Sequence, residues 1–428
     1  MTRRIAIFYP TCPAPAQGGS HRRCLEMLEG FNALGLNVSL LSTTLGGAER
    51  WQKALRDDLL SKFTDDVHVY DLGIAERKAA ALIHRGRALL GRVPPMDSRA
   101  YSFWGVRRWF SRTCESLAPD ALLMNYANWD RILDHRRFSG LKRIMETHDL
   151  LTLNLKMHGE VDRRLPPEPI RPGSVPDVLV QEDFFSSLGL EPDPLEFSIY
   201  DRYDATIAIS RREQAILEAS THRTKVVFLP MTAEPALKEN DFSGPALYTM
   251  GKHPYTLQGY LYFLRRVVPL LRENGKDFRL DVTGAFYRQV EPVPESGMVF
   301  KGFVPDLEAV YRRARFAVCP VLGGTGQQVK IVEAMAQGLP VVALDGDADP
   351  VPVVHGENGF AVRGAEEMAE CILALWRDRA RCRTMGDAAR ETVRETLSRS
   401  RLLNDLEGLL AAPAASLKAA RKADAENS

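Results

Sequence analysis

The sequence predicts an α/β protein whose two halves are each built on a doubly wound, mainly parallel sheet. Two observations support this prediction. Short apolar runs alternate with helix-period segments along the 428 residues, and a stretch rich in proline and glycine, residues 230–245, separates the halves. The order strand, loop, helix, strand is that of a right-handed βαβ unit. We therefore expect an N-terminal domain over residues 1–229, a linker over 230–245 and a C-terminal domain over 246–397.

Composition excludes several classes of function. The chain is 45% hydrophobic and 26% charged, as is typical of a globular protein, and its formal net charge of +1 provides no broad basic field for nucleic acid. The six cysteines form no Cys-x-x-Cys pair, which indicates free thiols in a reducing compartment. No apolar run has the ~18 residues of a membrane span, and the N-terminal run stops at Pro10. We therefore expect a cytoplasmic protein.

The N-terminal half opens with a strand over Arg4–Tyr9, a helix from about Ser20 to Leu34 and a strand over Leu36–Ser42. Gly18 and Gly19 lie between the first strand and the helix, where parallel sheets bind ligands. A plain loop with Ser20 as the helix cap explains them equally well. Further strands are expected over Ala121–Tyr126, Leu141–Thr147, Ala205–Ser210 and Lys225–Leu229, with helices near Trp129–Arg136 and over Arg211–Ala219.

The stretch Ala75–Arg112 is basic and aromatic. It holds nine lysines and arginines against two acidic residues, interleaved with large apolar side chains. We expect one helix over about Ala75–Leu90, a break at Pro94-Pro95 and a second helix over about Tyr101–Leu117. The cations and rings suit contact with an anionic membrane surface. The alternative is a pair of ordinary helices with solvated arginines and buried rings.

Polar residues follow the strand Leu141–Thr147, where an α/β sheet places its functional loop. Among them, His148 is a candidate for contact with a substrate hydroxyl or phosphate. It is also suited to capping the next helix. The segment Asn154–Glu196 that comes next is proline-rich and weakly periodic, which indicates a functional loop or a small helical insertion.

The C-terminal half repeats the alternation. Strands are expected over Ala246–Met250, Phe278–Thr283, Gly297–Phe300, Phe316–Pro320, Leu339–Leu344 and Gly359–Val362. Helices are expected over Leu257–Glu273, Pro305–Arg313, Glu366–Arg377, Ala380–Leu397 and Ser400–Leu410. The residues after the domain comprise a final helix within 398–412 and a tail, 413–428, whose alanine and charge content predicts disorder.

The central feature of this half is the glycine-rich stretch Gly323–Pro340, in which Gly323, Gly324 and Gly326 directly precede a helical segment. Glycines before a helix start leave room for a phosphate to approach free backbone N–H groups at the positive end of the dipole. Thr325 adds a hydroxyl and Lys330 a full charge. The spacing is neither that of a P-loop nor Gly-x-Gly-x-x-Gly.

Glu333 completes this candidate site. A carboxylate repels phosphate but accepts hydrogen bonds from two adjacent ribose hydroxyls, so Lys330 with Glu333 favours a nucleotide diphosphate. The alternative is a surface ion pair between the two residues at i, i+3.

These residues resemble a known family. The run from Gly324-Thr325-Gly326 to Pro340 is similar to the donor-binding signature of glycosyltransferase family 4 and related retaining enzymes of the GT-B fold, and specifically to a subgroup with Gly-Thr-Gly before the helix. The resemblance extends to Gly251, Gly302-Phe303-Val304 with Asp306, Asn358-Gly359-Phe360, Gly18-Gly19 and His148-Asp149. It implies two Rossmann-like domains facing a cleft and a final helix that crosses back to the first domain.

The resemblance also implies roles for the candidate residues. Glu333 would hold the ribose, and Lys330 with the loop amides would stabilise the departing diphosphate. His148 would lie near the sugar. Further donor contacts would come from Gly18, Gly19, Gly251, Lys252, Gly324, Thr325 and Gly326. One departure concerns the donor sugar: many members carry Glu-x7-Glu, whose first position here is Thr325.

The activity implied is that of a retaining glycosyltransferase that uses a nucleotide-diphosphate sugar and a glycan or lipid-linked acceptor in cell-surface polysaccharide synthesis. No cofactor or metal is expected. The enzyme would work in the cytoplasm, with membrane contact through Ala75–Arg112 at the inner face of the plasma membrane. Two alternatives stay open: a sugar-nucleotide epimerase of the same fold, and a non-catalytic nucleotide-binding relative, which the missing first glutamate would suit.

Overall fold

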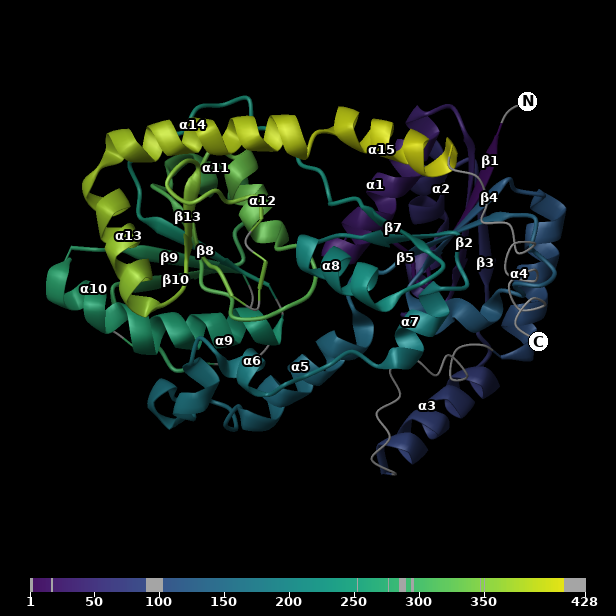
Figure 1. Ribbon diagram of the computed structural model, residues 1–428, viewed down its shortest axis with the longest axis horizontal. Helices are drawn as coiled ribbons and strands as arrows, with labels where there is room; N and C mark the ends of the chain where they lie inside the picture. Colours follow the sequence, from purple (N-terminus) through teal and green to yellow (C-terminus); the bar gives the residue numbers. More distant parts are fainter. Residues whose placement is uncertain are drawn as a thin grey trace. The chain divides into compact units, whose positions relative to one another are not determined.

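The structure is a computed structural model that describes residues 3–16, 18–89, 103–251, 253–275, 277–284, 290–293, 296–346, 348–349 and 351–411 (Figure 1). The chain divides into two compact units. The first unit comprises Met1–Thr152, Pro192–Met231 and Leu402–Ser428; the second comprises Leu153–Glu191 and Thr232–Arg401.

The first unit contains a seven-stranded parallel sheet in the order β3-β2-β1-β4-β5-β6-β7. Its strands are β1 (Arg4–Phe8), β2 (Asn37–Thr43), β3 (Asp66–Tyr70), β4 (Ala121–Asn125), β5 (Lys142–Glu146), β6 (Ala205–Ala208) and β7 (Lys225–Phe228). Its helices include α1 (Gly19–Ala33), α2 (Lys53–Lys62), α3 (Ile74–Leu89), α4 (Trp104–Leu117), α7 (Pro194–Tyr200) and α8 (Arg211–Ser220), with short 3₁₀ turns at Ala48–Trp51 and Ala127–Ile132.

The second unit contains a six-stranded parallel sheet in the order β10-β9-β8-β11-β12-β13. Its strands are β8 (Ala246–Met250), β9 (Leu280–Gly284), β10 (Met298–Gly302), β11 (Ala317–Cys319), β12 (Val341–Leu344) and β13 (Gly359–Val362). The helix α9 (Pro254–Tyr262) continues through a π-helical turn (Phe263–Val267) into α10 (Val268–Asn274). The other helices are α5 (Leu151–Arg164), α6 (Phe184–Ser187), α11 (Leu307–Arg313), α12 (Val329–Ala336), α13 (Ala365–Arg377) and α14 (Arg379–Thr396), with 3₁₀ turns at Pro172–Ser174 and Asp177–Val180.

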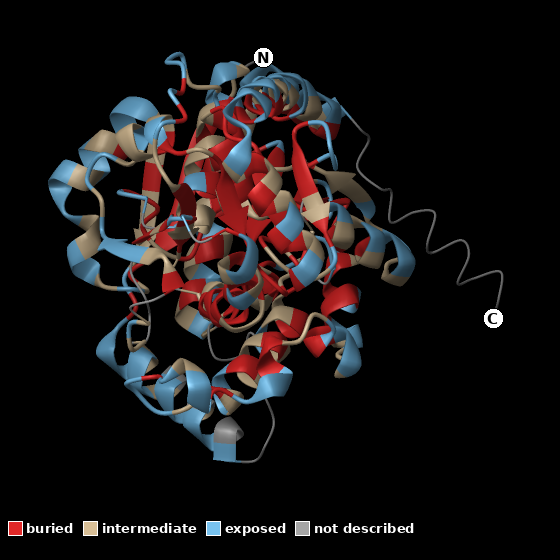
Figure 2. Ribbon diagram, turned by 90° about the vertical axis from the view of Figure 1, so that its left-hand side faces the viewer, coloured by how far each residue is buried: buried red, intermediate tan, exposed pale blue. Residues whose placement is uncertain are grey.

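Most strands are buried on both faces, as expected for parallel sheets covered by helices. In Figure 2 these strands are mostly red, and the helices show pale blue outer faces. The apolar core of the first unit also includes Leu402, Leu406 and Leu409 of the last helix, α15 (Arg399–Ala411). The chain therefore returns to the first unit at its C-terminal end.

Each sheet has one point at which the strand order reverses. In the first sheet the order runs outward in both directions from β1 and β4, and in the second from β8 and β11. In open α/β sheets, ligands bind beyond the carboxyl ends of the strands at such a switch point. The segments after β1 and β4 lead to Gly18 and Tyr126; those after β8 and β11 lead to Gly251 and the glycine loop.

Three expectations are corrected by the structure. The segment Asn154–Glu196 begins with the helix α5, which agrees with the helical insertion offered as one alternative, but its residues up to Glu191 group with the second unit rather than with residues 1–229. Buried contacts explain this grouping: Gln258 donates to the carbonyl of Leu179, for example. The helix expected near Trp129–Arg136 is a 3₁₀ turn over Ala127–Ile132. Two elements, α2 and β3, were not expected at all.

None of the helices within the described ranges has the length and apolar character needed to cross a bilayer. The tail 413–428 lies outside the described residues.

Candidate functional site

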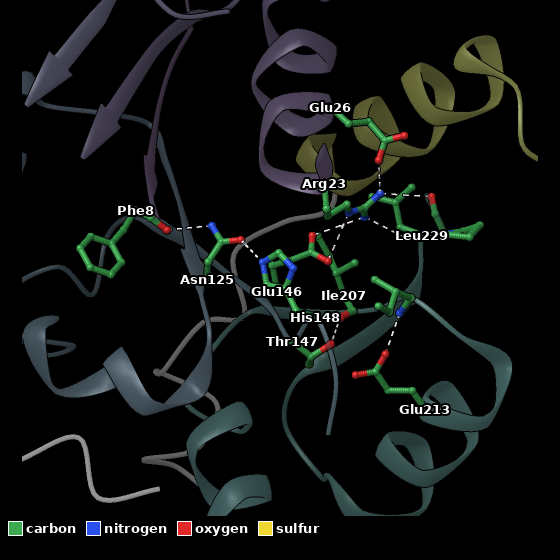
Figure 3. Close-up of polar contacts among 12 residues, drawn as sticks. Phe8, Arg23, Glu26, Asn125, Glu146, Thr147, His148, Ile207, Glu213 and Leu229 are labelled. Atoms are coloured by element: carbon green, nitrogen blue, oxygen red, sulfur yellow. Dashed lines mark hydrogen bonds and ion pairs between the residues drawn. The ribbon is translucent and has the colours of Figure 1, made fainter. Parts of the chain in front are cut away.

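The candidate site of the first unit lies at the switch point of its sheet, where His148 follows β5 and Asn125 ends β4. The Nε2 atom of His148 lies 2.6 Å from the Oδ1 atom of Asn125. Asn125 in turn donates from Nδ2 to the carbonyl of Phe8, at 2.7 Å, as Figure 3 shows. Three neighbouring strands therefore fix the imidazole.

His148 adopts a left-handed backbone conformation, with φ of 61°, which is uncommon for a residue with a side chain. Its ring stacks on Tyr126, with centroids 4.3 Å apart, and meets Tyr9 edge-on at 5.9 Å. Burial, with smaller contributions from the nearby Arg23 and His21, lowers the pKa of His148 to about 3. The imidazole is therefore neutral at physiological pH.

The alternative role of His148, capping the next helix, is wrong. The first amides of α5, those of Leu151 and Thr152, donate to the carboxylate of Glu196 at 2.8 and 3.0 Å. Because Glu196 satisfies these donors, His148 is left for another role.

A buried ion pair holds the strand that leads to His148. The guanidinium of Arg23, on α1, lies 3.4 Å from the carboxylate of Glu146 and 2.8 Å from that of Glu26. It also donates to the carbonyls of Leu229 and Pro230, at 2.8 and 3.1 Å (Figure 3). Arg23 thus ties α1 to the end of β5 and to the chain that follows β7.

Gly18 and Gly19 stand at the start of α1. Gly18 is the N-cap residue and Gly19 the first helical residue, so Ser20 does not cap this helix as the alternative had it. Gly18 is extended, with φ of −171°, and a Cβ atom there would meet no atom of the described residues within 4 Å. The packing of the protein therefore does not require a glycine at this position, which is consistent with a ligand approaching it.

The candidate site of the second unit includes the glycine loop between β11 and α12. A Cβ atom on Gly323 would lie 2.1 Å from the ring of Phe185 and 2.8 Å from Met157. Gly324 has φ of +135°, which side chains rarely permit, and its Cβ position is 3.7 Å from Tyr255. The fold thus accounts for two glycines that the sequence suggested were placed for a phosphate.

The next two loop residues differ in exposure. Thr325 is fully buried, so its hydroxyl is not presented at the surface, contrary to the role expected for it. Gly326 is half-buried.

Lys330 and Glu333 lie in the first turns of α12. The Nζ atom of Lys330 donates to Oε2 of Glu333 at 2.7 Å, and the side chains keep 34% and 18% of their surface exposed. The i, i+3 ion pair that was the alternative to a ligand site is therefore present in the structure. The two roles are compatible, because an exposed pair of this kind is worth only ~0.2–0.5 kcal/mol and breaks readily for a stronger partner.

Gly251 follows β8, the strand that pairs with β11 at the switch point of the second sheet. A Cβ atom on Gly251 would meet nothing within 4 Å. As at Gly18, the packing of the protein does not explain the glycine. The neighbouring candidate, Lys252, lies outside the described residues.

Other residues of the family signature have structural roles. Gly302 has φ of 63°, and the carboxylate of Asp306 caps α11 by accepting from the amide of Ala309 at 2.9 Å. Asn358 accepts from the amide of Val354 at 2.7 Å and donates to the hydroxyl of Thr392 at 2.9 Å. These contacts shape the loops of the second unit.

Residues 244–378 match the family model described as glycosyl transferases group 1. Every candidate residue of the second unit lies in this range. The second unit therefore carries a group 1 glycosyltransferase domain, and the predicted two-domain Rossmann-like architecture, that of the GT-B fold, is confirmed. The fold and the matched domain are therefore both of a kind found in glycosyltransferases.

Three solved structures resemble almost the whole chain, and identities this low show the fold alone. Sucrose-phosphate synthase from Thermosynechococcus elongatus is 16% identical, with 95% of this chain and 98% of that chain covered and a TM-score of 0.58. Anabaena HepE, in complex with UDP, is 13% identical, with 96% and 99% covered and a TM-score of 0.62. A mutant of S. aureus TarM, in complex with Fondaparinux, alpha-GlcNAc-glycerol and UDP, is 10% identical, with 96% and 100% covered and a TM-score of 0.61.

Among curated proteins, an exopolysaccharide phosphotransferase of Streptomyces coelicolor is 34% identical over 84 residues. The matched stretch covers 19% of this chain and 9% of that protein.

Proposed function

We propose that the protein is a retaining glycosyltransferase that moves a sugar from a nucleotide-diphosphate sugar to a glycan or lipid-linked acceptor in cell-surface polysaccharide synthesis. The observation that carries the proposal is the position of Lys330 and Glu333. They lie together at the start of α12, directly after the switch point of the second sheet and within the matched domain. The matches to an exopolysaccharide phosphotransferase and to UDP-bound proteins support it.

Each residue has a role in this reaction. The amides at the start of α12 and the ammonium of Lys330 stabilise the diphosphate as the bond to the sugar breaks, which is where negative charge develops. Glu333 accepts hydrogen bonds from the ribose hydroxyls. Gly251 and Lys252, with Gly324 and Gly326, complete the donor site. Gly18 and Gly19 with His148 provide the contacts of the first unit.

We propose that this reaction needs no metal, because Lys330 and the helix start supply the positive charge. A competing feature is the sequence Asp-Gly-Asp-Ala-Asp at 345–349, directly after β12. Carboxylates spaced in this way suit Mg²⁺ or Mn²⁺. Turnover that is unchanged after treatment with EDTA and dialysis supports metal independence. Loss of turnover that Mg²⁺ or Mn²⁺ restores overturns it.

The experiment that tests the function starts with a thermal-shift screen of sugar nucleotides, since stabilisation grows with the ratio of ligand concentration to Kd. The donor that stabilises the protein is then assayed for transfer to acceptors. Lys330→Ala should lower turnover by orders of magnitude without changing the melting temperature in the absence of donor. Lys238→Ala is the control, because Lys238 also forms an ion pair in the second unit, with Glu308 at 3.1 Å, although that pair is more exposed.

Two results would replace the proposal. An isomerised sugar nucleotide formed without acceptor would identify an epimerase. Binding of a sugar nucleotide with neither transfer nor hydrolysis would identify a non-catalytic relative, which the Thr325 position favours.

We also propose that the first unit touches an anionic membrane through α3 and the start of α4, within Ala75–Arg112. Four large apolar side chains of these two helices are 72 to 88% exposed: Ile74, directly before this stretch, and Leu82, Leu89 and Trp104 within it. The first three lie within one sector of α3, and exposed cations flank them on the same helix, as in helices that bind membrane surfaces.

Flotation with vesicles of phosphatidylcholine and phosphatidylserine tests this contact. The wild type should float at low salt, and Leu82→Glu with Leu89→Glu should stay at the bottom of the gradient. Leu237→Glu, at an equally exposed leucine of the second unit, should float like the wild type. A wild type that does not float rules this contact out.

A further inference from the structure

The side-chain amide of Asn125 has its orientation fixed by its two neighbours. One side of the amide faces the carbonyl oxygen of Phe8 at 2.7 Å, so the NH₂ group must lie on that side. The carbonyl side, Oδ1, then faces Nε2 of His148 at 2.6 Å. A flipped amide would place two acceptors against each other at Phe8. Because an amide oxygen only accepts, Nε2 of His148 must carry the proton.

Whether the other ring nitrogen of His148, Nδ1, carries a proton then depends on the charge of the ring. Positive charge faces the imidazole from Arg23 on α1, and the rings of Tyr9 and Tyr126 cover it. His21, also on α1, adds little charge, because burial lowers its own pKa. The carboxylate of Glu146, two residues before His148, is paired with Arg23. This environment keeps the imidazole neutral, so Nδ1 carries a lone pair and no proton.

Nδ1 is also available to a ligand. Within the described residues, the ring of His148 has a single hydrogen-bond partner, Asn125 at Nε2. His148 is 9% exposed, so it is not completely enclosed. A buried ring with one nitrogen fixed and the other open is arranged to bind something.

We propose that Asn125 is a positioning residue that holds His148 in the Nε2–H tautomer, so that Nδ1 accepts a hydrogen bond from a substrate hydroxyl. The sequence left open whether His148 meets a hydroxyl or a phosphate. The tautomer decides between them, because a phosphate oxygen and Nδ1 are both acceptors and repel each other. His148 therefore recognises a hydroxyl of the sugar or of the acceptor. The identity of the ligand in this inference rests on the proposed function, whereas the assignment of the tautomer does not.

The tautomer is measured directly by ¹⁵N NMR of the imidazole in the full-length wild type, with His148→Gln used to assign the signal. We expect a protonated Nε2 and an unprotonated Nδ1 throughout pH 5.5–8. A proton on Nδ1, or an imidazolium in this range, overturns the proposal. Because this measurement uses the wild type, it does not depend on whether a variant folds.

A charge change at Asn125 provides a second readout that simple loss of structure would not produce. In Asn125→Asp, the added carboxylate stabilises the imidazolium, so His148 should begin to titrate within the measured range. Asn32→Asp adds the same charge at an exposed position of α1 and should leave the His148 signal unchanged. A His148 signal that is equally unaffected in both variants contradicts the coupling.

Turnover then shows whether the coupling serves the reaction. With the donor found in the thermal-shift screen, Asn125→Ala should lower kcat/KM roughly ten- to a hundredfold, as expected for the loss of one buried hydrogen bond. The double variant with His148→Ala should be no worse than His148→Ala alone. If the two substitutions lower kcat/KM by independent factors that multiply in the double variant, Asn125 does not act through His148. A wild type that transfers no sugar would instead refute the proposed function and leave the NMR result standing.

Discussion

The guanidinium of Arg23 and the carboxylate of Glu146 lie 3.4 Å apart with side-chain exposures of 1% and 0%. Burial raises the pKa of Glu146 to about 6, and Arg23 opposes this rise. The pair therefore persists at neutral pH because each charge satisfies the other, and because two backbone carbonyls take the remaining guanidinium donors. Removing one partner leaves the other charge buried and uncompensated.

Arg23→Met should destabilise the protein by about 3–5 kcal/mol, the usual cost of breaking a buried ion pair from one side. Urea unfolding measures the change. The double variant Arg23→Met with Glu146→Leu removes both charges and should recover a large part of the loss. If the double variant is as unstable as the sum of its two single changes, the pair is not coupled as the contacts indicate.

The stability of the protein should depend on His148 at acidic pH. Its pKa is about 3 in the folded protein against 6.5 ordinarily, so below pH 6.5 the unfolded chain binds the extra proton. The stability contributed by the neutral ring is complete above pH 6.5 and is lost progressively as the pH falls. At pH 5 the loss amounts to about 2 kcal/mol.

The measurement compares the wild type with His148→Asn in urea at pH 7.5 and pH 5. The wild type should lose about 2 kcal/mol more than the variant on acidification. His222→Asn, at an exposed histidine, should lose as much as the wild type. An identical pH dependence in the wild type and His148→Asn would show that the ring is not held neutral by burial.

Strands that are buried on both faces could be predicted closely from the sequence, because their apolar runs are continuous. Ala246–Met250 and Gly359–Val362 match the structure residue for residue. The missed strand β3 reads Asp-Val-His-Val-Tyr and is only partly buried, so two polar side chains, Asp66 and His68, interrupt its apolar run. The grouping of Leu153–Glu191 with the second unit could not be predicted, because it depends on distant contacts such as Gln258 to Leu179.

Candidate residues with charged side chains could be predicted from the sequence. Lys330 and Glu333 stood out as a cation and a carboxylate on one helix face. Asn125 did not, because it is uncharged and ends an apolar run; its signal was a polar residue at the last position of a central strand. The reason for Gly323 was misjudged, because the sequence does not show that Phe185 packs on it.

Gly323→Ala should destabilise the second unit by about 1–3 kcal/mol, because the new methyl group overlaps the ring of Phe185. Thermal unfolding without ligand measures this effect. Phe185→Leu provides space, so the two changes together should cost less than their sum by about 0.5–3 kcal/mol. If the destabilisations of the two single variants simply add, the contact with Phe185 is not the reason for a glycine at this position.

The contact between α1 and α15 allows a similar test in the first unit. Gly30 lies inside α1, where glycine costs ~1 kcal/mol relative to alanine. A Cβ atom there would lie 2.7 Å from Cδ1 of Leu406, a fully buried residue of α15. Close approach of the two helices therefore explains the glycine.

Leu406→Ala should destabilise the first unit by about 2–5 kcal/mol, because it leaves a cavity against α1. In that background Gly30→Ala no longer overlaps a side chain and should stabilise the helix by up to ~1 kcal/mol, more than it does in the wild type. Gly86→Ala, at a glycine of α3 with nothing within 4 Å of its Cβ position, should have the same effect in both backgrounds. If Gly30→Ala also has the same effect in both, α15 does not pack on α1 through these two residues.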